Sequence, residues 1–156
     1  MGNQDTNAGA QISLVADASA VDGAQAVVQA FCEQYALTPE ASASLELVVE
    51  ELVANCLDHG GATGSDGIRL SLTLDQDHVI IFMSDNGQAF DPKTDLPQDT
   101  RFAAPDDRPI GGLGWLLINH YCELLSTERR LDRNELVLRF STGASQLTRL
   151  YAARQR

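Results

Sequence analysis

The sequence is poor in cysteine: only three of its 156 residues are Cys, and they lie far apart. Cys32, Cys56 and Cys122 form no C-x-x-C pair and their number is odd, so neither a zinc site nor a disulfide framework is supported. Cys56 falls within an apolar pattern of helical period. We therefore expect reduced thiols in a hydrophobic core.

Long hydrophobic runs and positive charge are scarce as well. No run approaches the ~18 apolar residues of a membrane helix. The first twenty residues contain neither the charged n-region nor the long apolar stretch of a secretory signal. The chain has 11 Lys and Arg against 22 Asp and Glu, a formal net charge of −11. Such a charge repels nucleic acid and anionic membranes. We expect a complete cytoplasmic domain that binds neither of them directly and favours soluble, basic partners.

The remaining composition is that of an ordinary globular protein, with 44% hydrophobic and 21% charged residues. A chain of this length suits one domain with a sizeable core. We expect a loose tail at residues 1–10, one domain at 11–142, and a C-terminal tail at 143–156 that contains a short basic helix.

Apolar spacing predicts the order of the helices and strands within that domain. Alternation and helical periods predict an edge strand at 12–16, helices at 21–35 and 39–59, a hairpin of 68–74 and 79–83, a long connection at 87–112, a helix at 113–125, and a hairpin of 126–131 and 135–140. Thr38 is the expected N-cap of the second helix. Because hairpins pair their strands antiparallel, we expect an α/β sandwich with a mostly antiparallel sheet and helices on one face.

The second helix carries an acid and an amide on one stripe. Residues four apart on a helix are offset by only about 40°, so Glu51, Asn55 and His59 share a face. An amide oxygen is a hard ligand suited to Mg²⁺, and Glu51 is placed to take a proton from a group attacking a γ-phosphate. The alternative is an ordinary solvated face, which Glu50 fits because it is about 100° away. His59 is better explained by the negative end of the helix dipole.

A turn, Asp85-Asn86-Gly87, follows the strand at 79–83. A carboxylate at a strand end can accept a hydrogen bond from the exocyclic amine of adenine, which guanine lacks at that position. Gly87 would let the backbone come close to the base. A plain turn is the alternative for this segment viewed alone.

Glycines precede the third predicted helix, in the run Gly111-Gly112-Leu113-Gly114. Free backbone N–H groups and the positive end of the dipole favour a polyphosphate at such a position. No Lys follows as in a Walker loop, and no strand-glycine-helix unit of the dinucleotide type precedes it. Arg101 and Arg108 in the long connection can reach over bound phosphates. A glycine hinge and solvating arginines are the alternatives.

Together, the motifs E-L-V-A-N at 51–55, D-N-G-Q-A-F-D-P at 85–92 and R-P-I-G-G-L-G at 108–114 resemble the GHKL ATPase superfamily. Within it, the chain is similar to the anti-sigma-factor serine/threonine-protein kinases (RsbW/SpoIIAB-like). The resemblance covers residues 12–141. It implies a Bergerat-type ATP-binding fold, with a mostly antiparallel mixed sheet, helices packed on one face, and a long ATP lid at 88–110.

The resemblance also implies roles for particular residues, with ATP and Mg²⁺ as the bound groups. Asn55 would hold the metal and Glu51 would be the catalytic base. The nucleotide would be bound by Asp85, Gly87, Arg108, Gly111, Gly112, Leu113, Gly114 and Asn134. Asn134 follows Arg133 where superfamily members often have a Gly-Thr pair, so its adenine contact is a departure from the pattern.

The partners implied by the resemblance are proteins. The family phosphorylates a Ser or Thr of a small STAS-type anti-sigma-factor antagonist and sequesters a sigma factor or another output protein. The resemblance also allows a homodimer. One alternative is an ATP-regulated binding module that sequesters a regulator without significant kinase turnover, against which the intact Glu51 argues mildly. Another is the ATP domain of a sensor histidine kinase, for which no helix with a phospho-accepting His precedes residue 12.

Overall fold

The computed structural model describes residues 9–58, 60–96 and 112–143. Its elements, in chain order, are β1 (Gly9–Leu14), α1 (Ala20–Gln34), α2 (Pro39–Asp58), β2 (Ile68–Asp75), β3 (His78–Asp85), α3 (Gly112–Tyr121), β4 (Cys122–Arg130) and β5 (Arg133–Ser141). The predicted lid beyond residue 96, Arg101, Arg108, Gly111, His59 and the predicted C-terminal helix lie outside the described residues.

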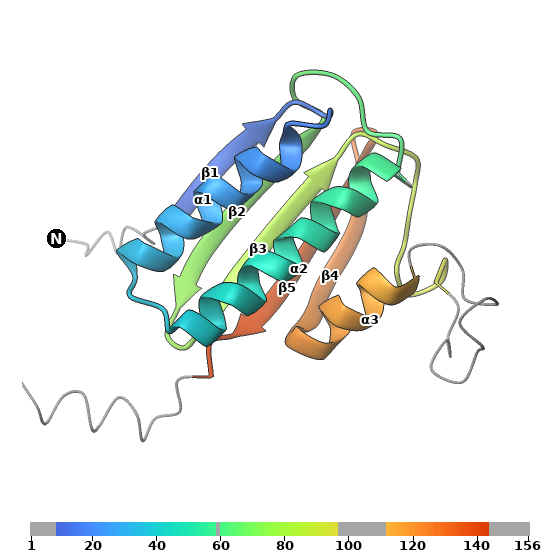
Figure 1. The fold of residues 1–156 in the computed structure, drawn as a ribbon. Helices are drawn as coiled ribbons and strands as arrows, with labels where there is room; N and C mark the ends of the chain where they lie inside the picture. Colours follow the sequence, from blue (N-terminus) through green and yellow to red (C-terminus); the bar gives the residue numbers. More distant parts are fainter. Residues whose placement is uncertain (1–8, 59, 97–111, 144–156) are drawn as a thin grey trace, which may run out of the picture.

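The strands form one sheet in the order β1-β2-β3-β5-β4, and every described pair is antiparallel. The three helices cover a single face of this sheet, with α2 in the middle (Figure 1). The predicted α/β sandwich is confirmed, and so is the edge position of the first strand. The register of β3 and β5 sets Asp85 directly opposite Asn134, which brings two distant polar residues together at one end of the sheet.

Along the strands, buried apolar side chains alternate with more exposed ones, and the apolar ones face the helices. The buried positions are Ile68, Leu70 and Leu72 of β2, Val79, Ile81 and Met83 of β3, and Leu136, Leu138 and Phe140 of β5. Successive strand residues point to opposite faces, so this period of two gives each strand one apolar face. That face is the one covered by the helices.

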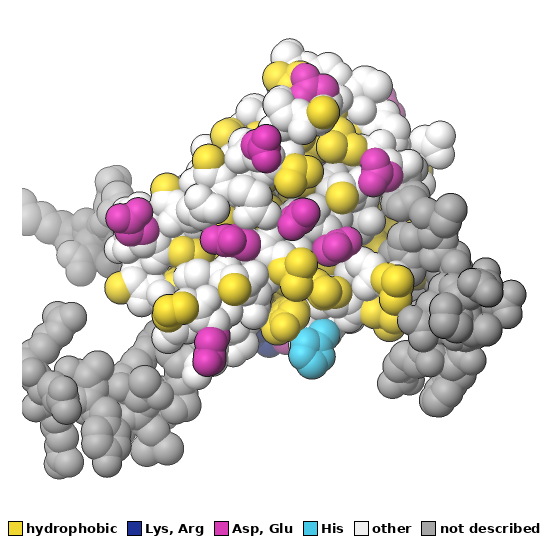
Figure 2. Space-filling view, viewed as in Figure 1, with side chains coloured by type: hydrophobic (Ala, Val, Ile, Leu, Met, Phe, Trp, Pro, Cys, Tyr) yellow, Lys and Arg dark blue, Asp and Glu magenta, His cyan; other side chains and the backbone are white. Residues whose placement is uncertain are grey.

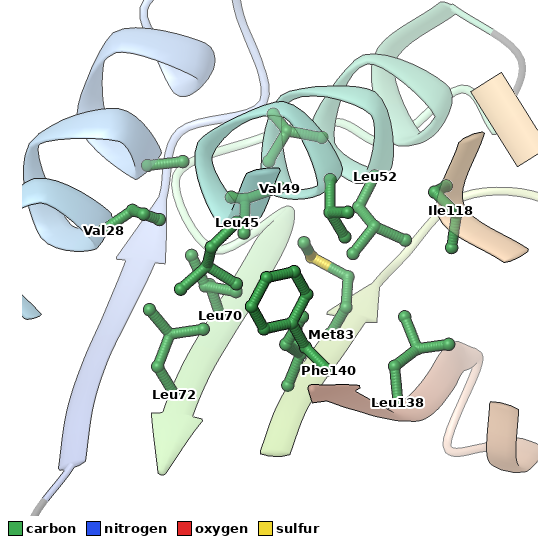
Figure 3. Close-up of a cluster of buried hydrophobic side chains, with 14 of the residues drawn as sticks. Val28, Leu45, Val49, Leu52, Leu70, Leu72, Met83, Ile118, Leu138 and Phe140 are labelled. Atoms are coloured by element: carbon green, nitrogen blue, oxygen red, sulfur yellow. The ribbon is translucent and has the colours of Figure 1, made fainter. Parts of the chain in front are cut away.

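Helix α2 supplies the other half of the core. Its buried side chains recur at intervals of three and four residues, as expected of an amphipathic helix. Leu45, Val49 and Leu52 point toward Met83 and Phe140 of the sheet (Figure 3). The helix begins at Pro39, and the backbone N–H of Ala41 donates to Thr38 Oγ1 at 3.1 Å, which confirms the predicted N-cap.

Most predicted boundaries shift by one or two residues, including that of β3, which extends to Asp85, and two differ by more. The third helix was expected to run to residue 125, but it ends at Tyr121 and passes directly into β4. The reason is strand pairing: Cys122 lies opposite Phe140 and Leu124 opposite Leu138, and both are more buried than Glu123 and Leu125. Apolar residues close together at a helix end fit either period, and only the partner strand decides.

The first strand also starts earlier than expected. Gly9 and Ala10 were assigned to the N-terminal tail, but they pair with Thr73 and Leu72 of β2. A Cβ at Gly9 would lie 2.5 Å from the carbonyl oxygen of Leu72, so the absence of a side chain permits the close pairing.

The described cysteines are free thiols, as predicted from their spacing. Cys32 and Cys56 are buried, and burial raises the pKa of each. Burial likewise raises the pKa of Cys122, to about 12. Among the described residues, no helix is long and apolar enough to cross a membrane, and no group of His, Cys, Asp and Glu has the arrangement of a metal site.

Two leucines of α2 test the packing of this helix. Leu45 is fully buried, whereas Leu47 is 36% exposed. We expect Leu45→Ala to lower the free energy of unfolding by about 2–5 kcal/mol, because it leaves a cavity against the sheet. Leu47→Ala should change it by less than about 0.5 kcal/mol. Urea denaturation followed by circular dichroism measures both, and equal losses would contradict the assigned face of α2.

Candidate active site

The structure brings α2 and the first turn of α3 together at three predicted site residues. Glu51 and Asn55 lie one turn apart on α2, and Gly114 lies in α3. A Cβ built on Gly114 would be 2.5 Å from Glu51 Oε2 and 3.8 Å from Asn55 Nδ2. The acid and the amide therefore face the glycine-rich end of α3, and a side chain at position 114 would displace the carboxylate from its place.

The amide of Asn55 is incompletely satisfied. Its Nδ2 atom is buried and has no hydrogen-bond partner among the residues that the structure describes. A buried unpaired donor costs about 1–3 kcal/mol, so such an atom indicates a missing acceptor. A phosphate oxygen is an acceptor of the required kind, and the Oδ1 atom of the same amide is a hard oxygen ligand of the type that Mg²⁺ takes. The residues present fit a magnesium-bound phosphate.

Helix α3 begins within the glycine motif. Gly112 is its first residue, so Leu113 and Gly114 belong to the first turn and do not form a separate loop before the helix. The N–H groups of a first turn have no acceptor inside the helix. Leu113 is 59% exposed, whereas Gly114 is buried against Glu51. The turn places N–H groups without intrahelical acceptors and a positive dipole end beside Glu51 and Asn55, which suits an anion.

Asp85 closes the other side of the site, at the end of β3. Its side chain is buried, and its Oδ1 atom accepts hydrogen bonds from Gly87 N at 2.9 Å and from Asn134 Nδ2 at 3.2 Å. Burial, followed by the negative charge of Asp85 and a hydrogen bond to it, raises the pKa of the Cys56 thiol well above its usual value. Cys56 comes directly after Asn55, so Asp85 lies against the same stretch of α2 as the other site residues.

In the structure Gly87 permits a close approach between two backbone segments. A Cβ there would collide with the carbonyl oxygen of Gly60, at the end of α2. The same carbonyl accepts a hydrogen bond from Gln88 N at 2.6 Å. The side chain of Asn86 forms a pair of hydrogen bonds with the backbone of Thr63, in the loop between α2 and β2. Gly87 therefore lets the turn after β3 pack on the end of α2.

Asn134 is buried beside Asp85, at the start of β5. Its amide makes four hydrogen bonds. Nδ2 donates to Asp85 Oδ1 and to Gln88 O, at 3.2 and 2.7 Å, and Oδ1 accepts from Phe90 N and from Arg129 Nη1, at 3.0 and 3.1 Å. The residue thus joins the end of β3, the segment after it, and β4.

Two residues of this site were not found from the sequence. Arg129 Nη1 also donates to the carbonyl oxygen of Gly87 at 2.8 Å, and the thiol of Cys56 contacts Asp85. Neither residue belongs to a motif that points to it. Arg129 reaches the site because β4 and β5 pair, and Cys56 because α2 crosses the end of β3. Sequence spacing carries no signal for either contact.

An aromatic contact joins the segment after β3 to α3. The ring of Phe90, from the segment after β3, lies 5.9 Å from that of Trp115 in α3. Trp115 is buried. The packing of these two rings holds the segment after Asp85 against the helix that begins with the glycines.

Comparison with known proteins agrees with this arrangement. The model of the histidine kinase-like ATPase domain matches residues 14–140. The chain belongs to this family. The resemblance inferred from the three motifs is thereby confirmed, and the antiparallel sheet with three helices on one face is its expected fold.

The chain is similar in sequence to one relative and in fold to two solved structures. The chain is 32% identical over 96 residues to the serine/threonine-protein kinase BtrW of Bordetella bronchiseptica. The aligned residues make up 67% of BtrW and 61% of this chain. Its fold is similar to that in a structure of the RsbU and RsbW domains of Rv1364c from Mycobacterium tuberculosis, with 17% identity and a TM-score of 0.60. It is also similar to that in the SiaB–SiaC complex from Pseudomonas aeruginosa, with 14% identity and a TM-score of 0.54.

The coverage of the two structures differs. The match spans 86% of this chain but 32% of the Mycobacterium tuberculosis chain, and 84% of this chain and 88% of the Pseudomonas aeruginosa chain. At these identities the two structures show a shared fold.

Gly114 provides a direct test of the assembled site. In Gly114→Ala, the new methyl group would occupy the place of Glu51 Oε2, so the carboxylate must turn away and reshape the phosphate site. We expect Mg-ATP binding to weaken at least about tenfold, which is 1.4 kcal/mol. Stability should not fall, because Ala is favoured over Gly in a helix by about 0.5–1 kcal/mol.

The control is the double variant Glu51→Ala/Gly114→Ala, in which the clash is gone. Calorimetry should show its Mg-ATP affinity close to that of Glu51→Ala alone. If Gly114→Ala binds as the wild type does, Gly114 does not adjoin the phosphate site.

Proposed function

We propose that this protein is a cytoplasmic, Mg-ATP-dependent protein serine/threonine kinase that acts as a partner switch. The observation that carries the proposal is the contact of Gly114 with Glu51 and Asn55, with an unpaired buried amide nitrogen at the same place. A carboxylate, an amide and a helix N-terminus at one point form a site for transfer of a phosphoryl group to a hydroxyl. The similarity to a serine/threonine-protein kinase supports the same conclusion.

Phosphoryl transfer asks a protein mainly to position its reactants and to neutralise charge. Glu51 accepts the proton of the attacking hydroxyl, because its carboxylate lies at the phosphate end of the site. Asn55 and the first-turn N–H groups of α3 hold the phosphates, with Asn55 Oδ1 as the protein ligand of Mg²⁺. When bound, the metal ion neutralises phosphate charge. Asp85 accepts a hydrogen bond from the adenine amine and selects the base.

The proposed phosphate acceptor is a Ser or Thr of a small STAS-type antagonist, and the alternative partner is a sigma factor or another output protein. Neither α1 nor α2 contains a Lys or Arg, and both carry acidic residues. Figure 2 shows these acids spread over the helix face, with apolar side chains between them. A partner that approaches Glu51 over this face would meet an acidic and partly apolar surface.

A binding module without kinase turnover is the second candidate. It needs a nucleotide site but no base, so Glu51 decides between the two. The carboxylate of Glu51 beside Gly114 favours the kinase, because a pure binder does not need a base at the phosphate end of the site.

Two adjacent acids of α2 separate catalysis from binding. We expect Glu51→Ala to lower phosphate transfer to the antagonist at least about a hundredfold, because it removes the general base. Mg-ATP affinity should stay within about threefold, since less than 1 kcal/mol of binding depends on this group. Transfer is followed with radiolabelled ATP. Glu50→Ala is the matched control, exposed and about 100° away, and should transfer as the wild type does. Unchanged transfer in Glu51→Ala would exclude the assigned base.

The two ends of the nucleotide are tested separately. We expect Asp85→Ala and Asn55→Ala each to weaken Mg-ATP binding at least about tenfold, because the first loses the adenine acceptor and the second the metal ligand. Asn55→Ala should also remove the gain in affinity that Mg²⁺ gives, whereas Asp85→Ala should keep it. Calorimetry with and without EDTA measures both effects. Glu50→Ala, an exposed acid on another face of the same helix, is the control, and wild-type affinity in either site variant would count against the site.

A further inference from the structure

We propose that Asn134 sets the base specificity of the nucleotide site as a positioning residue that acts through Asp85. The inference rests on the proposed function, in which Asp85 accepts the adenine amine. It assigns to Asn134 a role different from direct contact with the base.

The amide of Asn134 has no capacity left for a nucleotide. A carboxamide offers two N–H donors and two acceptor positions on its oxygen. Both donors are used, on Asp85 Oδ1 and Gln88 O, and the oxygen accepts from Phe90 N and Arg129 Nη1. A direct contact with adenine would require one of these bonds to break in an environment where Asn134 is only 4% exposed.

The bond to Asp85 orients the carboxylate. The register places Asp85 opposite Asn134 in neighbouring strands, with both side chains buried. The two nitrogen donors, Gly87 N and Asn134 Nδ2, converge on Oδ1 and neither of them contacts Oδ2. Because two hydrogen bonds hold Oδ1, rotation of the carboxylate is restricted. The Oδ2 atom is thereby fixed in one orientation as a hydrogen-bond acceptor. A fixed acceptor accepts from an amine and leaves a carbonyl oxygen at the same place unpaired.

The same amide fixes the backbone that follows Asp85. By bonding Gln88 O and Phe90 N, Asn134 sets the path of the segment that carries Phe90 to Trp115. Arg129 holds both Asn134 Oδ1 and the carbonyl of Gly87. The orientation of the base acceptor and the position of this segment therefore depend on one buried side chain.

Base preference is the readout that separates this role from a purely structural one. Inosine triphosphate carries a carbonyl where ATP carries the amine, and the two share the ribose and the phosphates. The affinities of the wild type for ATP and for inosine triphosphate are measured by calorimetry in the presence of Mg²⁺. The same is done for Asn134→Leu, which has the same branching at Cγ and no hydrogen-bonding group.

We expect the wild type to prefer ATP. In Asn134→Leu the ratio of the two affinities should fall at least about tenfold, mainly by loss of ATP binding, because Asp85 is no longer held as an oriented acceptor. If the variant weakens both nucleotides by the same factor, or keeps the wild-type ratio, the proposal is overturned and Asn134 is structural only.

Surface variants decide the matter if Asn134→Leu does not fold. Arg129→Met removes one bond to the Asn134 amide, and Arg130→Met is its neighbour, which pairs with Glu128. We expect the ATP preference to fall about threefold in Arg129→Met and to stay unchanged in Arg130→Met. Equal ratios in the two variants would overturn the proposal.

The wild type tests the proposed function separately. If the wild type binds no ATP, or binds both nucleotides equally, the adenine assignment of Asp85 fails. If the wild type discriminates and the Asn134 and Arg129 variants do so equally well, only the role of Asn134 fails.

Discussion

Helix α2 is fixed in rotation by the apolar side chains that it packs on the sheet, and this rotation places the reactive groups. With Leu45, Val49 and Leu52 turned into the core, Glu51 and Asn55 must lie toward α3. A helix has no freedom to turn one stripe without turning the other, because 3.6 residues per turn fix the angle between them. The burial of a hydrophobic stripe thus orients a polar one, and the first turn of α3 completes the site.

A second constraint is the buried polar group at the end of β3. Asp85 and Asn134 are both buried, and an unpaired polar atom is costly in a buried position. Their hydrogen bonds join β3, β5, β4 and the segment after β3 into one network. Such a network stabilises only the arrangement that satisfies all of its members. At the base end the amide of Asn134 uses all of its hydrogen-bonding positions and holds Oδ1 of Asp85, whereas the phosphate end retains the unpaired nitrogen of Asn55.

Most of the fold could be predicted from the alternation of apolar residues, including the order of the elements, both hairpins and the cap at Thr38. The errors lay at boundaries. The end of α3 at Tyr121 is decided by pairing with β5, and the start of β1 at Gly9 by pairing with β2. Local periodicity contains no information about the partner strand. Element boundaries set by strand pairing are therefore the hardest feature of a fold to predict from local sequence.

The sequence by itself determined the family, the residue types of the site and the stripe shared by Glu51 and Asn55, because helical geometry and motif order depend only on the chain. The tertiary structure decided what Asn134, Cys56, Arg129 and Gly87 touch. These contacts arise where strands and helices far apart in sequence pack together, and a pairing of β3 with β5 across 49 residues leaves no mark on local spacing. Packing thus turned three motifs, each weak alone, into one site.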